Sequence, residues 1–293
     1  MKKFIIAILV FIIVFIGGYF LIDCVMDKKD KKPEQTEEAI EPAEANVELR
    51  ERLANATGRY TLRITGENTL TMSEESETLL GGVGIEQIVI EGVDGATITA
   101  TGAPMKTVKA ANGAELVFRN LTIEDETEDT GSAWTNYLWL GGRLVFENCT
   151  INDSIYLTSD VSATFVNCKI VSSQSKYYGA WVADGSATFE GCTFTGYRGL
   201  KIHEFEGGDD VVNVSINKCL FEALSEKPGI AIGEFFVEPL ETTVSVTNSK
   251  FVGCQAWDTV GSLFGVDGFY ECDTPLENFK FINENNEVEF TAE

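Results

Sequence analysis

The hexapeptide FENCTI, Phe146–Ile151, decides the fold because related hexapeptides recur along the chain. Each has an apolar residue, a spacer, Asn or a substitute, a buried-type residue, a spacer and a second apolar residue. The other members are FRNLTI (Phe118–Ile123), FVNCKI (Phe165–Ile170), FEGCTF (Phe189–Phe194), INKCLF (Ile216–Phe221) and VTNSKF (Val246–Phe251). Their starting points lie 19 to 30 residues apart. A globular sandwich has no reason to repeat one turn signature, whereas a solenoid that adds one coil per repeat does.

The third residue of the repeat marks a sharp bend between two short strands. Asn and Gly tolerate the left-handed backbone conformation that such a bend requires. We therefore expect the same bend at Asn120, Asn148, Asn167, Gly191 and Asn248. Lys218 holds this position in the repeat that starts at Ile216, and it alone breaks the series.

A second set of strands lies between the repeats and alternates apolar and other residues with a period of two. Its members are YLWL (Tyr137–Leu140), IYL (Ile155–Leu157), AWVA (Ala180–Ala183), LKIH (Leu200–His203) and IAIG (Ile230–Gly233). Each coil therefore has at least three short strands.

This arrangement resembles the right-handed parallel β-helix proteins of the pectate-lyase-like superfamily, particularly their generic surface-protein members. ELRERLANATGRYTL (Glu48–Leu62) looks like the capping helix and first strand of such domains, and IVIEGVDGATITATG (Ile88–Gly102) looks like an early coil. The resemblance spans residues 47–281 and implies an all-β, single-stranded right-handed parallel β-helix. It implies no activity, because one β-helix scaffold carries many unrelated functions.

The N-terminal part of the chain predicts a membrane anchor and a tether. Residues 4–22, FIIAILVFIIVFIGGYFLI, are apolar throughout and long enough to span a bilayer, so residues 1–25 form a transmembrane helix or an uncleaved signal. Residues 26–45 are charged and lack aromatics, which predicts a flexible linker. Residues 46–293 then form the folded domain. Lysines on both sides of the apolar segment leave its orientation open, and the character of the domain favours the extracellular side of the cell membrane.

A short helix is expected where the folded domain begins. Asn46 can cap it, Val47, Leu49 and Leu53 supply an apolar side, and Gly58 can end it. Such a helix could cover the open end of the sheet structure.

Charge and composition limit the possible partners. The formal net charge of −24 opposes binding to nucleic acid, to an anionic membrane surface or to a polyanionic polysaccharide. The single histidine excludes a site built from several imidazoles, so a metal site must use carboxylates or thiolates. We expect no cofactor, with Ca²⁺ as the one candidate. Its proposed ligands lie in one acidic segment: Glu124, Asp125, Glu126, Glu128 and Asp129.

Four cysteines hold the same place in successive repeats: Cys149, Cys168, Cys192 and Cys219. Stacked coils place such residues about 4.8 Å apart and pointing inward. We expect a column of small apolar side chains, since no CxxC pair exists and stacked Cβ atoms align poorly for bridging. A thiolate metal site or a disulfide ladder is the alternative, and Cys254 could pair with Cys272.

The second strand set places a row of side chains on its outer face. Strict alternation points Trp139, Tyr156, Trp181 and Lys201 outward on consecutive coils. Exposed rings in such a row could stack on sugar rings of a glycan chain. Alternatively, loops fold over the sheet and bury the aromatics as a second core. In the superfamily that the chain resembles, this sheet and its flanking loops usually form the substrate cleft.

An enzymatic alternative rests on RGLKIHEFEGGDD, Arg198–Asp210. Lys201 or Arg198 could act as a general base, His203 shares the outward parity of Lys201, and Asp209 and Asp210 could hold a cation or act on a glycosidic bond. Gly-Asp-Asp is similar to a polygalacturonase motif, but the other signatures of that family are missing.

The sequence therefore favours a membrane-tethered extracellular module that binds glycans or cell-surface proteins, as in adhesion, without catalysis. A small polysaccharide lyase or glycoside hydrolase and a structural spacer are the alternatives.

Overall fold

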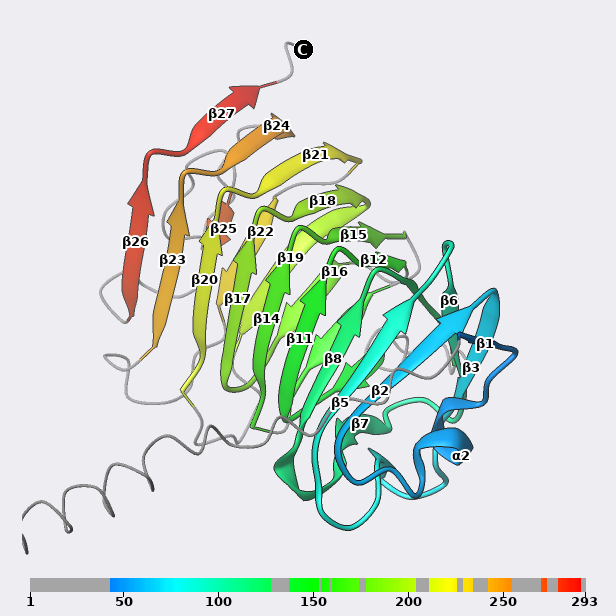
Figure 1. The fold of residues 1–293 in the computed structure, drawn as a ribbon. Helices are drawn as coiled ribbons and strands as arrows, with labels where there is room; N and C mark the ends of the chain where they lie inside the picture. Colours follow the sequence, from blue (N-terminus) through cyan, green and yellow to red (C-terminus); the bar gives the residue numbers. More distant parts are fainter. Residues whose placement is uncertain are drawn as a thin grey trace, which may run out of the picture. The chain divides into compact units, whose positions relative to one another are not determined.

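The structure is a computed structural model that describes residues 43–127, 137–152, 154–158, 160–173, 178–203, 211–225, 229–233, 242–254, 270–272 and 279–290. These residues all belong to one compact unit, Ile40–Glu293. Their strands form three sheets, which we name A, B and C and which run along the solenoid (Figure 1).

Sheet A has ten strands and starts at the N-terminal end of the solenoid. Its strands are β1 (Glu44–Ala45), β2 (Gly58–Thr65), β5 (Ile85–Gly92), β8 (Glu115–Arg119), β11 (Arg143–Glu147), β14 (Ser162–Val166), β17 (Ser186–Glu190), β20 (Asn213–Asn217), β23 (Thr243–Thr247) and β26 (Lys280–Glu284).

Sheet B has nine strands and sheet C has eight. Sheet B contains β3 (Glu67–Thr71), β6 (Thr97–Gly102), β9 (Thr122–Thr127), β12 (Thr150–Asn152), β15 (Lys169–Ser172), β18 (Thr193–Gly196), β21 (Leu220–Leu224), β24 (Lys250–Cys254) and β27 (Glu287–Phe290). Sheet C contains β4 (Glu77–Leu80), β7 (Thr107–Ala110), β10 (Leu138–Leu140), β13 (Ile155–Leu157), β16 (Tyr178–Val182), β19 (Arg198–His203), β22 (Ile230–Gly233) and β25 (Tyr270–Cys272).

Each coil contributes one strand to each sheet, and neighbouring coils pair in parallel. For example, β11 pairs with β14 from Arg143↔Ser162 to Glu147↔Val166 without a shift of register. The predicted three-strand coil is therefore confirmed.

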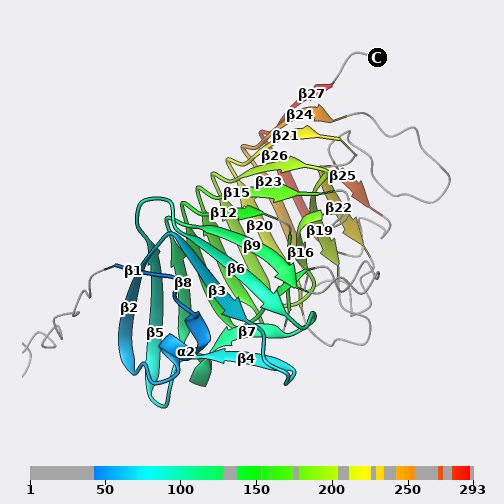
Figure 2. The same cartoon turned by 90° about the vertical axis from the view of Figure 1, so that its right-hand side faces the viewer.

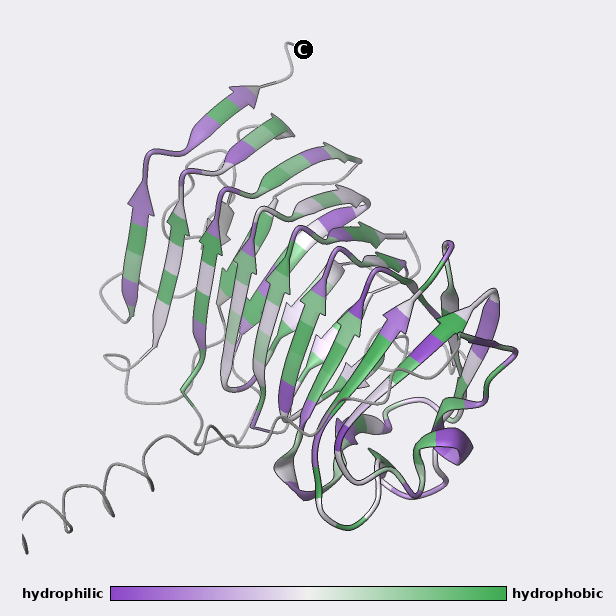
Figure 3. Ribbon diagram, in the orientation of Figure 1, coloured by the Kyte–Doolittle hydropathy of each residue, from purple (hydrophilic) through white to green (hydrophobic). Residues whose placement is uncertain are grey.

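The core fills the space that the three sheets enclose. Alternate residues of each strand point inward, and Figure 3 shows the resulting bands of hydrophobic and hydrophilic residues along sheet A. Equivalent positions stack from coil to coil, because a parallel ladder in register places identical side chains above one another. The rings of Phe146 and Phe165 lie 4.6 Å apart, and those of Phe165 and Phe189 lie 4.7 Å apart. Sheet B carries a second such stack, Phe194, Phe221 and Phe251.

The bend between sheets A and B has the predicted left-handed conformation. Its φ is positive in every repeat, at Asn120, Asn148, Asn167, Gly191, Lys218 and Asn248. Lys218, with φ of 51°, therefore does not break the series. The stacked coils on both sides impose the conformation on it, and its Nζ donates to Oε1 of Glu190 on the neighbouring coil at 2.8 Å.

The short helix exists but begins and ends at other residues than predicted. Helix α2 spans Leu49–Leu53, and the N-cap is Glu48, whose side chain accepts from the Glu51 N–H. Asn46 instead adopts a φ of 58°, and Gly58 starts β2. Leu49 and Leu53 are fully buried in the core, and Figure 2 shows α2 at the N-terminal end of the solenoid. Its role as a cap stays a prediction.

The N-terminal segments of the chain lie outside the described residues. These are the predicted anchor, residues 1–25, and most of the predicted linker, residues 26–45, of which β1 forms the last two residues. Within the part of the chain that the structure describes, no helix is both long and apolar enough to cross a membrane.

Candidate binding face on sheet C

The predicted row of side chains on sheet C has the predicted register. Trp139 pairs with Tyr156, Tyr156 with Trp181, and Trp181 with Lys201 on consecutive strands. Ala231 continues the row on β22. The period-two pattern therefore placed these residues correctly on one outer face of the solenoid.

Most of the row is buried, in contrast to the exposed platform that was one of the two expectations. Tyr156 is fully buried, Trp181 is 8 % exposed and Trp139 is half-buried. The rings of Trp139 and Tyr156 stack with centroids 4.9 Å apart, and those of Tyr156 and Trp181 lie 5.9 Å apart. We call these residues and their apolar neighbours the outer cluster: Tyr137, Trp139, Tyr156, Tyr178, Trp181, Ala183 and Ala231.

Two tyrosines that the sequence analysis did not single out complete the outer cluster. Tyr137 and Tyr178 contact Trp181 edge to face, at 5.3 Å and 5.2 Å between centroids. Burial raises the pKa of Tyr137 well above its ordinary value. Tyr137 lies two residues before Trp139 and shares its parity, so the alternation could have assigned it to the same face. The second core expected as the alternative is thus present.

The only histidine is part of this packing. His203 is 3 % exposed, its Nε2 lies 3.4 Å from the Tyr156 hydroxyl, and its ring meets Trp181 edge to face at 5.2 Å. Its predicted outward direction is correct, but the side chain does not face solvent. Lys201, in contrast, is half-buried at the end of the aromatic row. The other two catalytic candidates, Asp209 and Asp210, lie outside the described residues.

Arg198 is fixed at the start of β19 beside the outer cluster. Its Nη1 donates to the Tyr178 hydroxyl at 3.1 Å, and its guanidinium lies 5.3 Å from the Tyr178 ring and 5.5 Å from the Tyr197 ring. The Ser172 hydroxyl holds the turn, because it accepts from the Arg198 N–H at 2.9 Å and donates to the Arg198 carbonyl at 2.6 Å. The guanidinium of Arg198 therefore has a fixed position at the margin of the outer face of sheet C.

The described residues of the acidic segment do not converge. Glu124 and Asp125 are successive residues of β9 and point to opposite faces of sheet B. Asp125 is buried and accepts from the main-chain N–H and the hydroxyl of Thr127 at 3.0 and 2.7 Å, whereas Glu124 accepts from Asn152 at 3.4 Å. That these carboxylates bind calcium stays a prediction. Glu126 is exposed, and Glu128 and Asp129 lie outside the described residues.

The cysteine column is present as four buried free thiols, Cys149, Cys168, Cys192 and Cys219, so the disulfide ladder is excluded. Each Sγ lies within hydrogen-bonding distance of two carbonyl oxygens, as Cys149 does of Phe118 and Glu147 at 3.4 Å. A hydrogen bond with Cys168 and burial together raise the pKa of Cys149 far above its ordinary value. Among the described residues, no group of three or more His, Cys, Asp or Glu side chains is arranged to hold a metal ion. The four thiols pack within the main core as small buried side chains.

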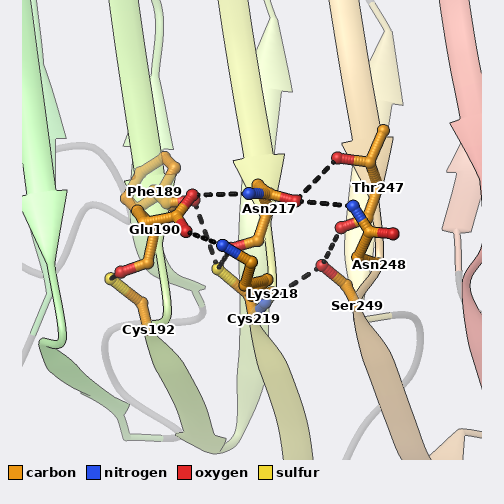
Figure 4. A network of polar contacts seen from close by, with 9 residues as sticks. All are labelled: Phe189, Glu190, Cys192, Asn217, Lys218, Cys219, Thr247, Asn248 and Ser249. Carbon is orange, nitrogen blue, oxygen red and sulfur yellow. Dashed lines mark hydrogen bonds and ion pairs between the residues drawn. The ribbon is translucent and has the colours of Figure 1, made fainter.

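Polar side chains connect successive bends on the other side of the solenoid (Figure 4). Glu190 accepts from Asn217 at 2.7 Å and from Lys218 at 2.8 Å, and Asn217 accepts from Thr247 at 3.0 Å and from Asn248 at 2.9 Å. The Lys218 ammonium, followed by the Asn217 amide, lowers the pKa of Glu190. Each of these contacts joins two neighbouring coils, so the role of these polar side chains is structural.

Comparison with known proteins agrees with this architecture. The family model described as a right-handed β-helix region matches residues 137–288, which is slightly more than half of the chain. No curated protein and no solved structure matches the chain. The family match and the three parallel sheets lead to one conclusion: the chain belongs to the right-handed β-helix family.

Proposed function

We propose that the chain is a non-catalytic, membrane-tethered extracellular β-helix that binds a glycan at the outer face of sheet C. The observation that supports this most directly is the packing of the Trp139 side chain and its indole N–H. Its ring is half-buried at the end of the aromatic stack, and among the described residues its buried indole N–H has no hydrogen-bond partner. A buried donor without an acceptor costs about 1–3 kcal/mol, and a ligand oxygen that reaches it when the covering side chains shift would remove that cost.

A sugar offers an apolar face that can stack on the indole ring of Trp139 and oxygens that can accept its N–H. Its C–H face stacks on an indole ring, and its hydroxyl or ring oxygens accept a hydrogen bond. The buried ring of Tyr156 stacks on Trp139 and is itself packed against Trp181, so one face of the indole is held before a ligand arrives. Lys201, two coils beyond Tyr156 in the same row, adds a positive charge to the face of a strongly acidic protein.

The non-catalytic assignment is supported by the packing of one of the catalytic candidates. His203 is buried against Tyr156 and Trp181, which gives it a structural contact in place of access to substrate. The tether is supported by the apolar residues 4–22.

The test is a glycan array probed with the full chain and three variants. Trp139→Ala is expected to abolish binding, and Trp139→Phe, which keeps a ring and removes the N–H, is expected to weaken it about tenfold. Thr164→Ala, on the outer face of sheet A, is the matched control and should bind like the parent. Binding that survives Trp139→Ala on every glycan would refute the proposed face. Release of reducing ends from a polysaccharide by the parent, but not by Lys201→Ala, would refute the non-catalytic assignment.

A further inference from the structure

The two sides of Trp139 along sheet C differ in accessibility. Toward the C-terminal coils, Tyr156 is fully buried and Trp181 is 8 % exposed. Toward the N-terminal coils lie the first two strands of the sheet, β7 and β4, which pair in parallel close to α2 (Figure 2). A ligand that stacks on the half-buried ring of Trp139 therefore has buried rings on one side of it, and the accessible side chains nearest to it lie on β7 and β4.

The register of these strands defines which side chains follow Trp139. The ladder between β10 and β7 places Trp139 beside Thr107. On β4, Glu77 pairs with Thr107 and Leu79 pairs with Lys109. The residues that alternate with these in the strands are buried in the core, so all five side chains belong to the outer face of sheet C.

Lys109 and Glu77 form an ion pair on this part of the face. The Lys109 Nζ donates to Oε1 of Glu77 at 2.5 Å, and both side chains are partly exposed. An ammonium has more than one donor and a carboxylate has more than one acceptor position. The pair can therefore donate to one ligand hydroxyl and accept from the neighbouring one. Because the two charges cancel, it offers these hydrogen bonds without a net charge.

Leu79 adds an apolar surface beside the ion pair. Its side chain is 47 % exposed, and it is one of three large hydrophobic side chains that are exposed in the described part of the chain. An aromatic ring, a donor and acceptor pair and an aliphatic side chain thus follow one another within two strand spacings, or about 10 Å. Apolar surface with a few placed polar groups is typical of a small-molecule site, and a sugar chain presents the matching C–H faces and adjacent hydroxyls.

We infer that sheet C binds an uncharged oligosaccharide that runs from Trp139 across the Lys109–Glu77 pair to Leu79. This inference rests on the proposed glycan-binding function and adds the class of sugar and the direction of the chain. One sugar stacks on Trp139, and adjacent hydroxyls of the next sugar accept from Lys109 and donate to Glu77. A uronic acid is disfavoured at the same place, because its carboxylate meets that of Glu77 in a protein with a net charge of −24.

Calorimetry on the full chain in detergent tests the class of sugar. The probes are neutral gluco-, manno- and galacto-oligosaccharides, with oligogalacturonate of the same length as the charged counterpart. The parent should bind at least one neutral probe about tenfold or more tightly than oligogalacturonate. Glu77→Gln leaves Lys109 with an unpaired charge, so it should weaken the neutral probe and strengthen oligogalacturonate, each about threefold or more. A purely structural role of Glu77 would not change the preference in this way.

Substitutions along the face test the direction of the chain. Lys109→Met keeps the length of the side chain and removes its donors, so it should weaken the neutral probe about tenfold. Leu79→Ala should weaken it about threefold through lost apolar contact. The matched controls are Lys169→Met on sheet B and Val83→Ala, an exposed apolar residue on the turn after β4. Both controls, and Lys201→Met at the other end of the row, should bind like the parent.

The outcomes separate this inference from the proposed function. Loss of binding in Trp139→Ala, with parent-like binding in Lys109→Met and Leu79→Ala, would overturn the inference and leave the proposed function intact. So would a parent that prefers oligogalacturonate, or a loss of binding in Lys201→Met instead of Lys109→Met. Parent-like binding in Trp139→Ala, or no binding of any glycan, would overturn the proposed function and the inference together. Circular dichroism shows whether each variant is folded.

Discussion

Replacing Trp181 by alanine tests the stability of the outer cluster independently of the core of the solenoid. Trp181 is 8 % exposed and contacts the rings of Tyr137, Tyr156 and Tyr178 at 5.3, 5.9 and 5.2 Å. Removing a buried Trp side chain typically costs about 3–5 kcal/mol, and three aromatic pairs at about 0.5–1.5 kcal/mol each account for much of that amount. We therefore expect Trp181→Ala to lower the free energy of unfolding of the outer cluster by about 4 kcal/mol.

The effect should be local, because the outer cluster and the main core are separate sets of buried residues. Near-UV circular dichroism, which reports ordered aromatic side chains, should fall sharply in Trp181→Ala. Far-UV circular dichroism, which reports the strands, should stay close to the parent. Urea unfolding followed by tryptophan fluorescence supplies the free energy.

The matched control is Trp139→Ala. Trp139 is half-buried and stacks on Tyr156, so its removal should cost about 1–2 kcal/mol. Equal costs for the two variants, or a Trp181→Ala protein with an unchanged near-UV spectrum and unfolding midpoint, would show that Trp181 is not the centre of a buried cluster.

Three further predictions concern the solenoid itself. The four column thiols, Cys149, Cys168, Cys192 and Cys219, should resist a thiol reagent at alkaline pH until denaturant is added; rapid labelling of the native protein would contradict their burial. Glu190→Gln should lower stability at pH 7 by less than about 1 kcal/mol, since the carboxylate is partly exposed. The pKa of Glu190 is depressed on folding, so this difference should vanish in unfolding curves as the pH falls below the ordinary value of 4.5, and a constant difference would refute the assignment. Gly196→Ala should cost about 3 kcal/mol or more in thermal unfolding, because φ is 107° and a Cβ would overlap the Ser172 carbonyl oxygen; Gly84→Ala, with φ of 79° and open space, should cost only about 1–2 kcal/mol.

The repeat predicted the fold because one signature encodes two physical requirements at once. Its apolar residues fill stacked interior positions, such as Phe146 and Phe165, and its Asn supplies a left-handed bend such as that at Asn148. Lys218 shows the limit of this reasoning. Residue preference predicted an exception there, but the ladder on both sides of the bend and the contact with Glu190 determine its conformation.

The candidate site could be predicted only in part. Alternation assigns a residue to the inner or outer side of a strand, and it assigned Trp139, Tyr156, Trp181 and Lys201 correctly. It cannot predict whether the outer side faces water, because that depends on side chains from other segments that pack over the sheet. For this reason nothing in the sequence of β19 predicts that His203 is buried.

The unbroken register of sheet A from β8 to β26 has an evolutionary consequence. Because β11 and β14 pair residue by residue, with Arg143 opposite Ser162, a duplication or deletion of one whole coil would place equivalent side chains in contact again. The phenylalanine stack and the thiol column would each gain or lose one member, and the rest of the interior would need no redesign. A gene for such a protein can therefore change the distance between its two ends in steps of one strand spacing, about 4.8 Å, while keeping a folded product at every step.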